Sequence, residues 1–356
     1  MKTLRQLRNF WTPWVITIVL ACFSNAGAQT SYQVTDLGTL HDGFFGCSMG
    51  LNNHGWTETQ YGVVDASGNL VKGRVAINVA GLTIDLGTLG GPNSWDNPFG
   101  GEINDQGDAV GYSETDVPDP DGEDVCGFGT HLECRPFLWQ KGHMSALPTL
   151  GGNNGQASAM NNRGQITGFA ETTIPDSGCP SFAPSHTALP TLWEEGKAHA
   201  FPTVGSDPDG EANMINDQGQ AVGYSGTCTA ALHAVLWEKD TAFPLPDLGT
   251  GAIAFGINNQ GQIVGTVGSS DNTTFFAAIW QNGALTNLGT LPGDFAAEAT
   301  SINNLGQVVG STRDSNFIFV HAFIWQDGVM TNLSTLFPAD SNLFPTMANS
   351  INSAGQ

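Results

Sequence analysis

The chain has 356 residues, of which 40% are hydrophobic, only 12% are charged and 46 are glycine. Its 33 acidic residues outnumber its 11 lysines and arginines, which gives a formal net charge of −22. A chain this acidic repels phosphate backbones and anionic lipid surfaces, so nucleic acid and membrane surfaces are excluded as expected partners and cations are favoured. The glycine-rich, neutral-polar composition is typical of turn-rich extracellular β proteins.

Residues 1–28 have the pattern of a secretory signal peptide. Three basic residues precede a short apolar segment, and the small residues Ala26 to Ala28 precede the expected cleavage point. Lipid attachment at Cys22 is the alternative, because the residues before it loosely resemble a lipoprotein box. The apolar segment is too short to cross a membrane, and no other segment is long enough. We therefore expect an extracellular, monomeric protein without a membrane span.

A five-residue motif, an apolar residue followed by Asn-x-x-Gly, recurs along the rest of the chain. The seven copies occupy residues 51–55, 103–107, 160–164, 215–219, 257–261, 302–306 and 351–355. Asparagine at the first turn position and glycine at the fourth favour a type I turn closed by a left-handed glycine, as in a bulged hairpin. Regular recurrence at such intervals indicates a repeat architecture that fills residues 29–356 as one domain.

A second hairpin belongs to each repeat and is clearest near the end of the chain. There an apolar strand ending in Trp325 leads into Asp327-Gly328, which predicts a type I′ turn, and the chain returns through Val329 to Leu333. Two hairpins make four short antiparallel strands, and about 40–50 residues is the size of one propeller blade. We predict an all-β propeller of seven four-stranded blades, the last one incomplete. A parallel β-helix and an α-solenoid lack these hairpins.

The two ends of the repeat array are irregular. The array starts near Tyr32 in what reads as the returning strand of a unit, and it stops at Gln356 inside the last hairpin. The late start fits a ring closed by strands from both ends of the chain. The early stop suggests a truncated gene or a fragment.

Several phrases together resemble the bacterial extracellular repeat family known as HAF. They are His321-Ala322-Phe323-Ile324-Trp325, Asp85-Leu86-Gly87-Thr88-Leu89-Gly90-Gly91 and Ile302-Asn303-Asn304-Leu305-Gly306-Gln307-Val308-Val309-Gly310. The resemblance covers about residues 32–356 and implies export and a propeller-like fold. It implies no catalytic residues, because the activity of that family is not established.

The cysteines that remain after cleavage are candidates for disulfides, because exported proteins form them. Cys126 and Cys134 lie in one long loop, and Cys179 and Cys228 occupy equivalent positions of consecutive repeats, so these are the two expected pairs. Cys47 is left over, and free buried thiols are the alternative. Neither the cysteine nor the histidine spacing suggests a zinc site.

Two sets of residues are candidates for binding. The tryptophans of the repeated strands are expected to pack between blades, whereas Trp56 and Trp95 lie outside that series and are better candidates for a ligand. Carboxylates at alternate positions before a glycine resemble a calcium loop, although the terminal glutamate of an EF-hand is missing. These calcium candidates are Asp116, Asp119, Asp121 and Asp124, and a solvated acidic loop is the alternative.

Function is expected in the unequal loops, because seven copies of one motif cannot form one active site. The longest insertions, 112–135 and 170–188, follow the same strand in successive repeats and should share one face. We expect a non-enzymatic binding or scaffold propeller that recognises a glycan or a surface protein there. The alternative is a carbohydrate-active hydrolase or lyase with carboxylates at the central channel.

Overall fold

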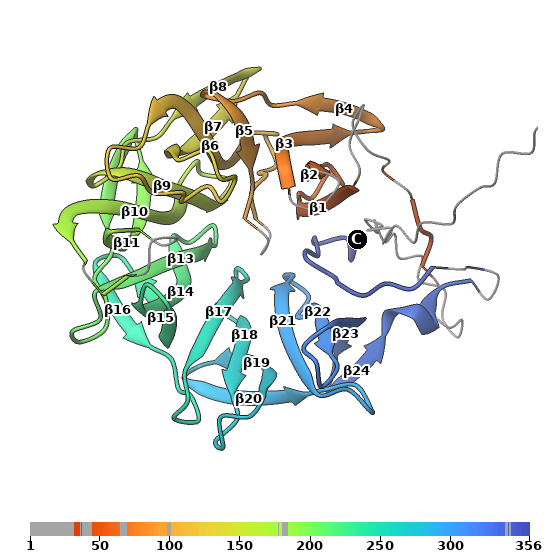
Figure 1. Cartoon of the computed structure of the whole chain (residues 1–356). Coiled ribbons are helices and arrows are strands. Elements are labelled where there is room, and N and C mark those ends of the chain that lie inside the picture. Colours follow the sequence, from red (N-terminus) through yellow and green to blue (C-terminus); the bar gives the residue numbers. More distant parts are fainter. Residues whose placement is uncertain are drawn as a thin grey trace, which may run out of the picture.

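The computed structural model describes residues 32–35, 37, 45–64, 70–97, 101–176, 178–179, 184–338, 341 and 343–356. The predicted signal peptide, with Cys22, and the side chain of Cys47 lie outside the described residues. The rest forms a ring of sheets around a central axis (Figure 1). No helix in this described part of the chain is long and apolar enough to cross a membrane.

The prediction of an all-β propeller with four-stranded antiparallel blades is confirmed. Blade one consists of β1 (Phe45–Leu51), β2 (Thr57–Val64), β3 (Leu70–Val79) and β4 (Leu82–Asp85). Blade two consists of β5 (Gly90–Trp95), β6 (Ala109–Pro118), β7 (Leu132–Gln140) and β8 (His143–Ala146). Blade three consists of β9 (Gly151–Met160), β10 (Ile166–Pro175), β11 (His186–Glu194) and β12 (Lys197–Ala200). Blade four consists of β13 (Asp209–Ile215), β14 (Gln220–Thr227), β15 (Ala230–Glu238) and β16 (Thr241–Pro244). Blade five consists of β17 (Ala252–Ile257), β18 (Ile263–Gly268), β19 (Phe275–Gln281) and β20 (Ala284–Gly289). Blade six consists of β21 (Ala296–Ile302), β22 (Val308–Arg313), β23 (Phe319–Gln326) and β24 (Val329–Asn332).

The number of blades differs from the seven expected, because the described residues form six four-stranded sheets. The seventh sector of the ring holds the 3₁₀ helix η1 (Leu333–Leu336) and the last copy of the motif. The N-terminal segment joins it there, since the Tyr32 amide donates to the Leu336 carbonyl at 3.0 Å. The last motif copy therefore contributes a turn to the ring without contributing a described strand.

The motif asparagines explain how the ring closes. In each turn the glycine has a φ of +73 to +81°, as a bulged hairpin requires. Six of the seven asparagine side chains donate to the backbone carbonyl of the motif asparagine in the next unit, at 2.9–3.1 Å. The bond from Asn352 to Asn52 joins the last unit to the first. A polar ring around the axis thus links turns that are far apart in the sequence.

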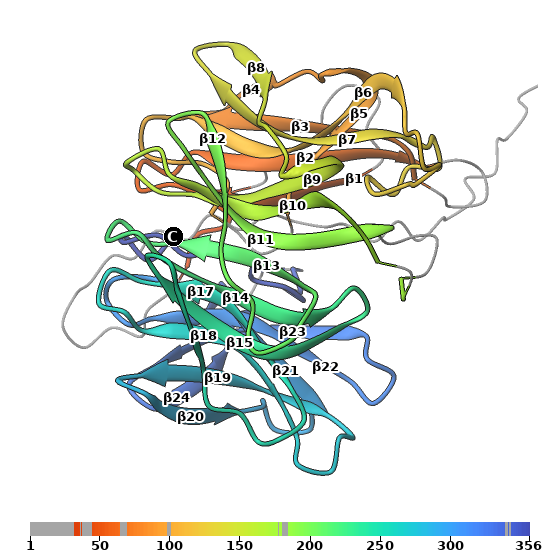
Figure 2. The same cartoon turned by 90° about the vertical axis from the view of Figure 1, so that its left-hand side faces the viewer.

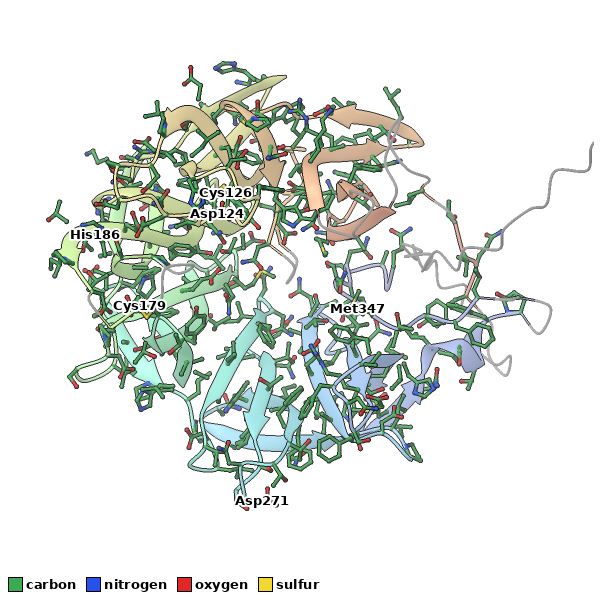
Figure 3. All side chains as sticks on the ribbon, in the orientation of Figure 1. Asp124, Cys126, Cys179, His186, Asp271 and Met347 are labelled. Atoms are coloured by element: carbon green, nitrogen blue, oxygen red, sulfur yellow. A yellow bond between two sulfur atoms is a disulfide. The ribbon has the colours of Figure 1, made fainter. Side chains whose placement is uncertain are left out.

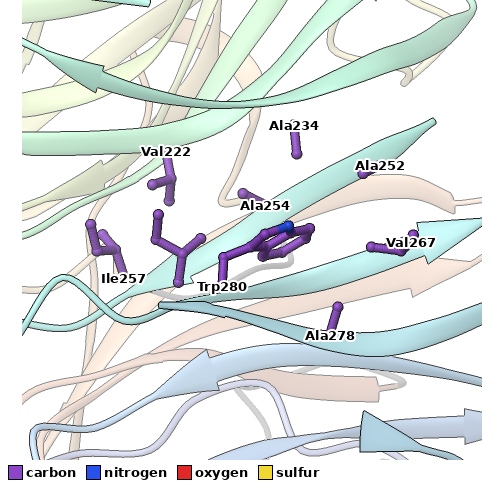
Figure 4. Close-up of a cluster of buried hydrophobic side chains, with 9 residues drawn as sticks. Val222, Ala234, Ala252, Ala254, Ile257, Val267, Ala278 and Trp280 are labelled. Carbon is purple, nitrogen blue, oxygen red and sulfur yellow. The ribbon is translucent and has the colours of Figure 1, made fainter. Parts of the chain in front are cut away.

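The repeated tryptophans pack between blades, as predicted. Trp280 is 1% exposed and lies among apolar side chains of blades four and five, including Val222 and Ala254 (Figure 4). Its indole N–H donates to the Pro246 carbonyl at 2.7 Å, in the connection that leaves the preceding blade. Trp193 and Trp237 make the same bond to the connections before their own blades, so one tryptophan fastens each of blades three, four and five to its neighbour.

A second repeated contact explains the histidine of the His-Ala-Phe phrase. Nδ1 of His321 lies 2.9 Å from Oδ2 of Asp294, and Thr312 donates to the same carboxylate oxygen at 2.5 Å. In blade four, His233 lies 2.8 Å from Asp207 in the same way. The histidine therefore ties the third strand to the loop that enters the blade. Its repeated role is structural.

Candidate functional site

The topology gives the propeller two unlike faces. The motif turns and the outer hairpin turns open on one side of the ring, and the loops that join the second strand to the third open on the other (Figure 2). We call this second side the loop face. It carries both long insertions, which are 119–131 between β6 and β7, and 176–185 between β10 and β11.

The two insertions meet on the loop face, as their positions in the repeat predicted. The Ser185 amide of the second insertion donates to Oε1 of Glu123 in the first. The first insertion also folds onto the innermost strand of blade three, where Asn154 Nδ2 donates to Glu123 Oε2 at 2.7 Å and to Asp119 Oδ2 at 2.9 Å. The side chains of adjacent blades therefore form one hydrogen-bond network beneath the surface of the loop face.

Two disulfides hold this surface, and they are the two expected pairs. Cys126–Cys134 ties the first insertion to the start of β7, with a Cα–Cα distance of 5.4 Å. Cys179–Cys228 ties the second insertion to the corresponding turn of blade four, with a Cα–Cα distance of 5.8 Å. Figure 3 shows Cys126, Cys179 and His186 in the same sector of the ring. The described parts of the insertions are thus fixed against the blades, and these parts have less ordering entropy to lose on binding.

Two equivalent glutamates of the second strands have different surroundings. Glu114 of β6 is fully buried, and its two oxygens accept hydrogen bonds from Thr130 Oγ1 and from Asn93 Nδ2. Glu171 of β10 is also fully buried, but only its Oε2 is satisfied, by the amides of residues 153 and 154 at 3.0 and 2.8 Å. Its Oε1 is buried without a hydrogen-bond partner in the described chain.

Glu171 belongs to a cluster at the junction of the insertions. A carboxylate oxygen of Glu123, one of Glu171 and a ring nitrogen of His186 all lie within 4.8 Å of one another. Burial, and then the negative charge of Glu123, raise the pKa of Glu171 from 4.5 to about 8. Asp121 Oδ2 lies 3.9 Å from His186 Nδ1 and adds a further negative charge at the exposed side. The cluster therefore favours a proton or a cation.

The four calcium candidates are not arranged as a single ligand set. Asp119 Oδ1 accepts the amides of Asp121 and Glu123, which is the hydrogen bonding of a turn, and Asp124 accepts the Gly129 amide in the same manner. Asp116 is exposed. Within the described residues, no three of these four aspartates place carboxylate oxygens within 4.8 Å of one another. A calcium role for these aspartates stays a prediction, and the convergent group in this region consists of Glu123, Glu171 and His186.

An aromatic patch lies on the loops of blades five and six, and we define it as Phe275, Phe295 and Phe317. The rings of Phe275 and Phe317 are stacked with centroids 6.0 Å apart, and the ring of Phe295 meets Phe317 edge-on at 5.5 Å. Phe317 is 44% exposed and Phe295 is 36% exposed. Arg313 lies beside the patch and is held by Glu298 at 3.1 Å. The sequence did not reveal this patch, because only the fold brings the start of β19 together with two loops.

Phe317 has an unusual backbone. Its φ is +60°, in the left-handed region that costs a bulky residue about 1–2 kcal/mol. The equivalent loop of blade five has Asn272 there, at φ +55°, and asparagine tolerates this conformation well. Asp314 supports the strained turn, because its Oδ1 accepts the amides of Asn316 and Ile318. Backbone strain of this kind clusters at functional sites, so the conformation marks Phe317 as a candidate for binding.

The two tryptophans proposed for a ligand lie apart from this patch. Trp56 follows the first motif turn, and its ring packs at the junction of blades one and two. Trp95 ends β5 and packs edge-on against Phe128 of the first insertion, with ring centroids 5.9 Å apart. Both are partly buried. The structure does not bring them together, and a ligand role for either stays a prediction.

The axial cavity was the other predicted location for chemistry. It has a volume of about 160 Å³ and is lined by the motif turns of all seven units. Its carboxylates, Asp105 and Asp217, accept hydrogen bonds from backbone amides of neighbouring turns at 2.9 and 3.0 Å. The buried carboxyl groups of Glu58 and Asp96 are not among the residues that line the cavity. The described residues therefore offer the axial cavity only carboxylates that already serve the ring.

The chain matches no protein-family model and no curated protein. Among solved structures it is similar to an acylaminoacyl peptidase in complex with Z-Gly-Gly-Phe-chloromethyl ketone, with a TM-score of 0.47, 10% identity, and coverage of 85% of this chain and 46% of that one. It is also similar to Pyrococcus horikoshii acylaminoacyl peptidase, with a TM-score of 0.46, 12% identity and the same coverages. A third similar structure is a triple arginine-to-alanine mutant of AofleA from Arthrobotrys oligospora. Its TM-score is 0.41 and its sequence identity is 12%, and the match covers 81% of this chain and 85% of that chain. This chain spans about half the length of the peptidase chains, and these similarities concern the fold alone.

Proposed function

We propose that the protein is a secreted binding propeller that recognises a glycan through its loop face. The observation that carries the proposal is the aromatic patch, in which the exposed rings of Phe295 and Phe317 pack with the partly buried ring of Phe275 at the start of β19. The carbon-bound hydrogens of a sugar ring form an apolar face, which packs well against a partly exposed aromatic ring. The resemblance to extracellular HAF repeats supports the exported location.

The surroundings of the patch suit the hydroxyl groups of a sugar. Asp271 and Asn316 are exposed on the neighbouring loops of blades five and six, and Figure 3 shows Asp271 at the rim of the ring. Their side chains supply acceptors and donors beside an apolar platform, which is the usual composition of a ligand site. The loops are also braced internally, because Thr274 Oγ1 donates to the Phe295 carbonyl at 2.9 Å. The platform is therefore preformed.

A glycan array with the mature chain tests the proposal, followed by titration calorimetry with the glycans retained. The variant Phe317→Asn removes the ring and places at φ +60° a residue that tolerates it, so the fold should be kept or stabilised. The matched control is Phe243→Asn, which removes an equally exposed phenylalanine, 45% against 44%, from the outer strand of blade four. We expect Phe317→Asn to weaken glycan binding at least tenfold and Phe243→Asn to leave it unchanged.

Three results would contradict the proposal. In the first, the wild-type chain retains no glycan on the array. In the second, Phe317→Asn binds glycan as tightly as the wild type. In the third, Phe317→Asn and Phe243→Asn lose the same amount of glycan affinity. If a purified surface protein binds where no glycan does, the partner is a protein. Release of new reducing ends from a bound glycan would favour the alternative, a carbohydrate-active hydrolase or lyase.

A further inference from the structure

We propose a binding site for a divalent transition-metal ion, of which zinc is the natural probe, formed by Glu123, Glu171 and His186 where the two insertions meet. The inference is independent of glycan binding, since the aromatic patch lies on other blades. It rests on the convergence of three ligand atoms within 4.8 Å and on the buried Oε1 of Glu171, which has no partner in the described chain.

The buried oxygen is the first step of the argument. A carboxylate that is removed from water needs hydrogen bonds or an opposite charge on both oxygens, and otherwise its burial costs several kcal/mol. Glu114 occupies the equivalent position in β6 and has a hydrogen-bond donor for each oxygen. The neutral side chains of Asn93 and Thr130 are these donors. At Glu171 the two backbone amides occupy Oε2, and Oε1 is left for another partner.

The second step is that a cation meets the needs of both carboxyl groups at this position. Glu123 is 4% exposed and contributes a second carboxylate, and its oxygens are positioned by the Ser185 amide and the Asn154 side chain. Each of those oxygens keeps a second lone pair for a metal. Within the described residues, salt bridges of lysine or arginine involve other carboxylates, namely Glu133 and Glu298. A cation between the two glutamates removes their repulsion and the cost of burial together.

The third step concerns the kind of cation. Calcium and magnesium take oxygen ligands, whereas an imidazole nitrogen with two carboxylates suits zinc and other first-row divalent metals. Three protein ligands leave a fourth position of a tetrahedral ion open, and the partly buried His186 lies toward solvent. The second convergent group, around Asp176 and Asp209, contains two cysteines that form a disulfide, so its sulfur atoms are not thiolate ligands.

The net charge of −22 also favours capture of a cation from solution. The position of the site gives it a structural consequence. Its ligands come from blade two, through Glu123, and from blade three, through Glu171 and His186. A bound metal therefore cross-links two blades and two insertions, and it should stabilise the folded chain by mass action.

The test uses the untagged mature chain with its disulfides intact, stripped with EDTA and titrated with zinc chloride in a calorimeter. We expect one zinc ion per chain at micromolar affinity or better. Glu171→Gln should weaken binding at least tenfold, and the matched control Glu114→Gln should leave it unchanged. His186→Asn, at a partly exposed position that does not threaten the fold, should weaken it to a similar extent.

Cobalt provides a second measurement that does not depend on a variant. Co²⁺ bound by nitrogen and oxygen ligands in a four-coordinate site should give a visible absorption band that zinc displaces. The proposal is overturned if the wild-type chain binds no zinc stoichiometrically, or if Glu171→Gln and His186→Asn bind as well as the wild type. Binding of calcium with equal affinity, unaffected by His186→Asn, would refute the assignment to a transition metal. Proton sharing between Glu123 and Glu171 without any metal binding would overturn the site itself.

Discussion

Removal of one motif asparagine should destabilise the whole ring measurably. Asn258 is 4% exposed and makes four hydrogen bonds of 2.7–3.0 Å. It accepts from the amides of Gln260 and Gln262, and it donates to the Gln262 side chain and to the Asn303 carbonyl of the next unit. At about 1 kcal/mol for each bond, with some replacement by water at the Gln262 side chain, Asn258→Ala should cost about 3 kcal/mol.

Urea unfolding followed by tryptophan fluorescence measures this loss, with an unchanged m value expected. The control is Gln260→Ala in the same turn, because this side chain is exposed and only its backbone amide serves the turn. Asn352→Ala, which cuts the bond that closes the ring to Asn52, should cost at least as much as Asn258→Ala. If Asn258→Ala were as stable as Gln260→Ala, within about 1 kcal/mol, the polar ring would not hold the blades together and the reasoning would be refuted.

Three further predictions concern the rest of the molecule. Trp237→Phe removes the 2.8 Å bond to the Pro202 carbonyl and leaves the space of the larger ring unfilled, so it should lower stability in urea by about 1–3 kcal/mol, whereas an unchanged midpoint would count against a fastening role. Cys228→Ser opens the bridge to Cys179, which spans 49 residues, and should cost about 4 kcal/mol by chain entropy, whereas a fully reduced wild-type sample should lose more because Cys126–Cys134 also opens. Burial, followed by the charges of neighbouring carboxylates, raises the pKa of Glu58 well above 4.5. The folded chain therefore keeps a proton that the unfolded chain loses, and the free energy of unfolding falls as the pH rises above 4.5. Glu58→Gln should then match the wild type at pH 4 and exceed it at pH 8, and thermal unfolding that shows the opposite order would disprove the assignment.

The repeats made most of the fold predictable. The turn at Asp327-Gly328 has φ of +51° and +85°, as the type I′ assignment requires, and the motif turns have their left-handed glycines. These features depend on a few neighbouring residues, so local chemistry determines them. The tryptophans were predictable for a similar reason, because a large apolar residue at the same position of each unit must be buried by the next unit.

The number of blades could not be predicted reliably from the sequence, because the chain has more motif copies than its described residues have four-stranded sheets. The seventh turn, Ile351 to Gly355, sits in the ring through the bonds of Asn352, although no described strands accompany it. A turn motif marks a position around the axis. Whether four strands form there depends on pairing partners that a motif does not encode.

The location of the cluster of Glu123, Glu171 and His186 was predictable, but its ligand set was not, and the aromatic patch lies on other blades. Unequal loop lengths pointed to the insertions, and the structure brings them together through Glu123 and the Ser185 amide. The calcium pattern drew attention to consecutive aspartates, yet Asp119 and Asp124 use their oxygens to form turns. One signal was available in the sequence, because Glu171 repeats the position of Glu114 in the next unit. Its importance becomes visible only once their different partners are known.

By itself, the sequence determined the strand and turn pattern, the two disulfide pairs and the face that carries the variable loops. These follow from short-range backbone preferences and from equal spacing in a repeat, which survive without knowledge of distant contacts. Only the tertiary structure decided which side chains meet. Glu123, Glu171 and His186 converge across two blades, and the aromatic patch gathers residues from one strand and two loops. Such contacts depend on how neighbouring blades are rotated and packed, and no local preference specifies that geometry.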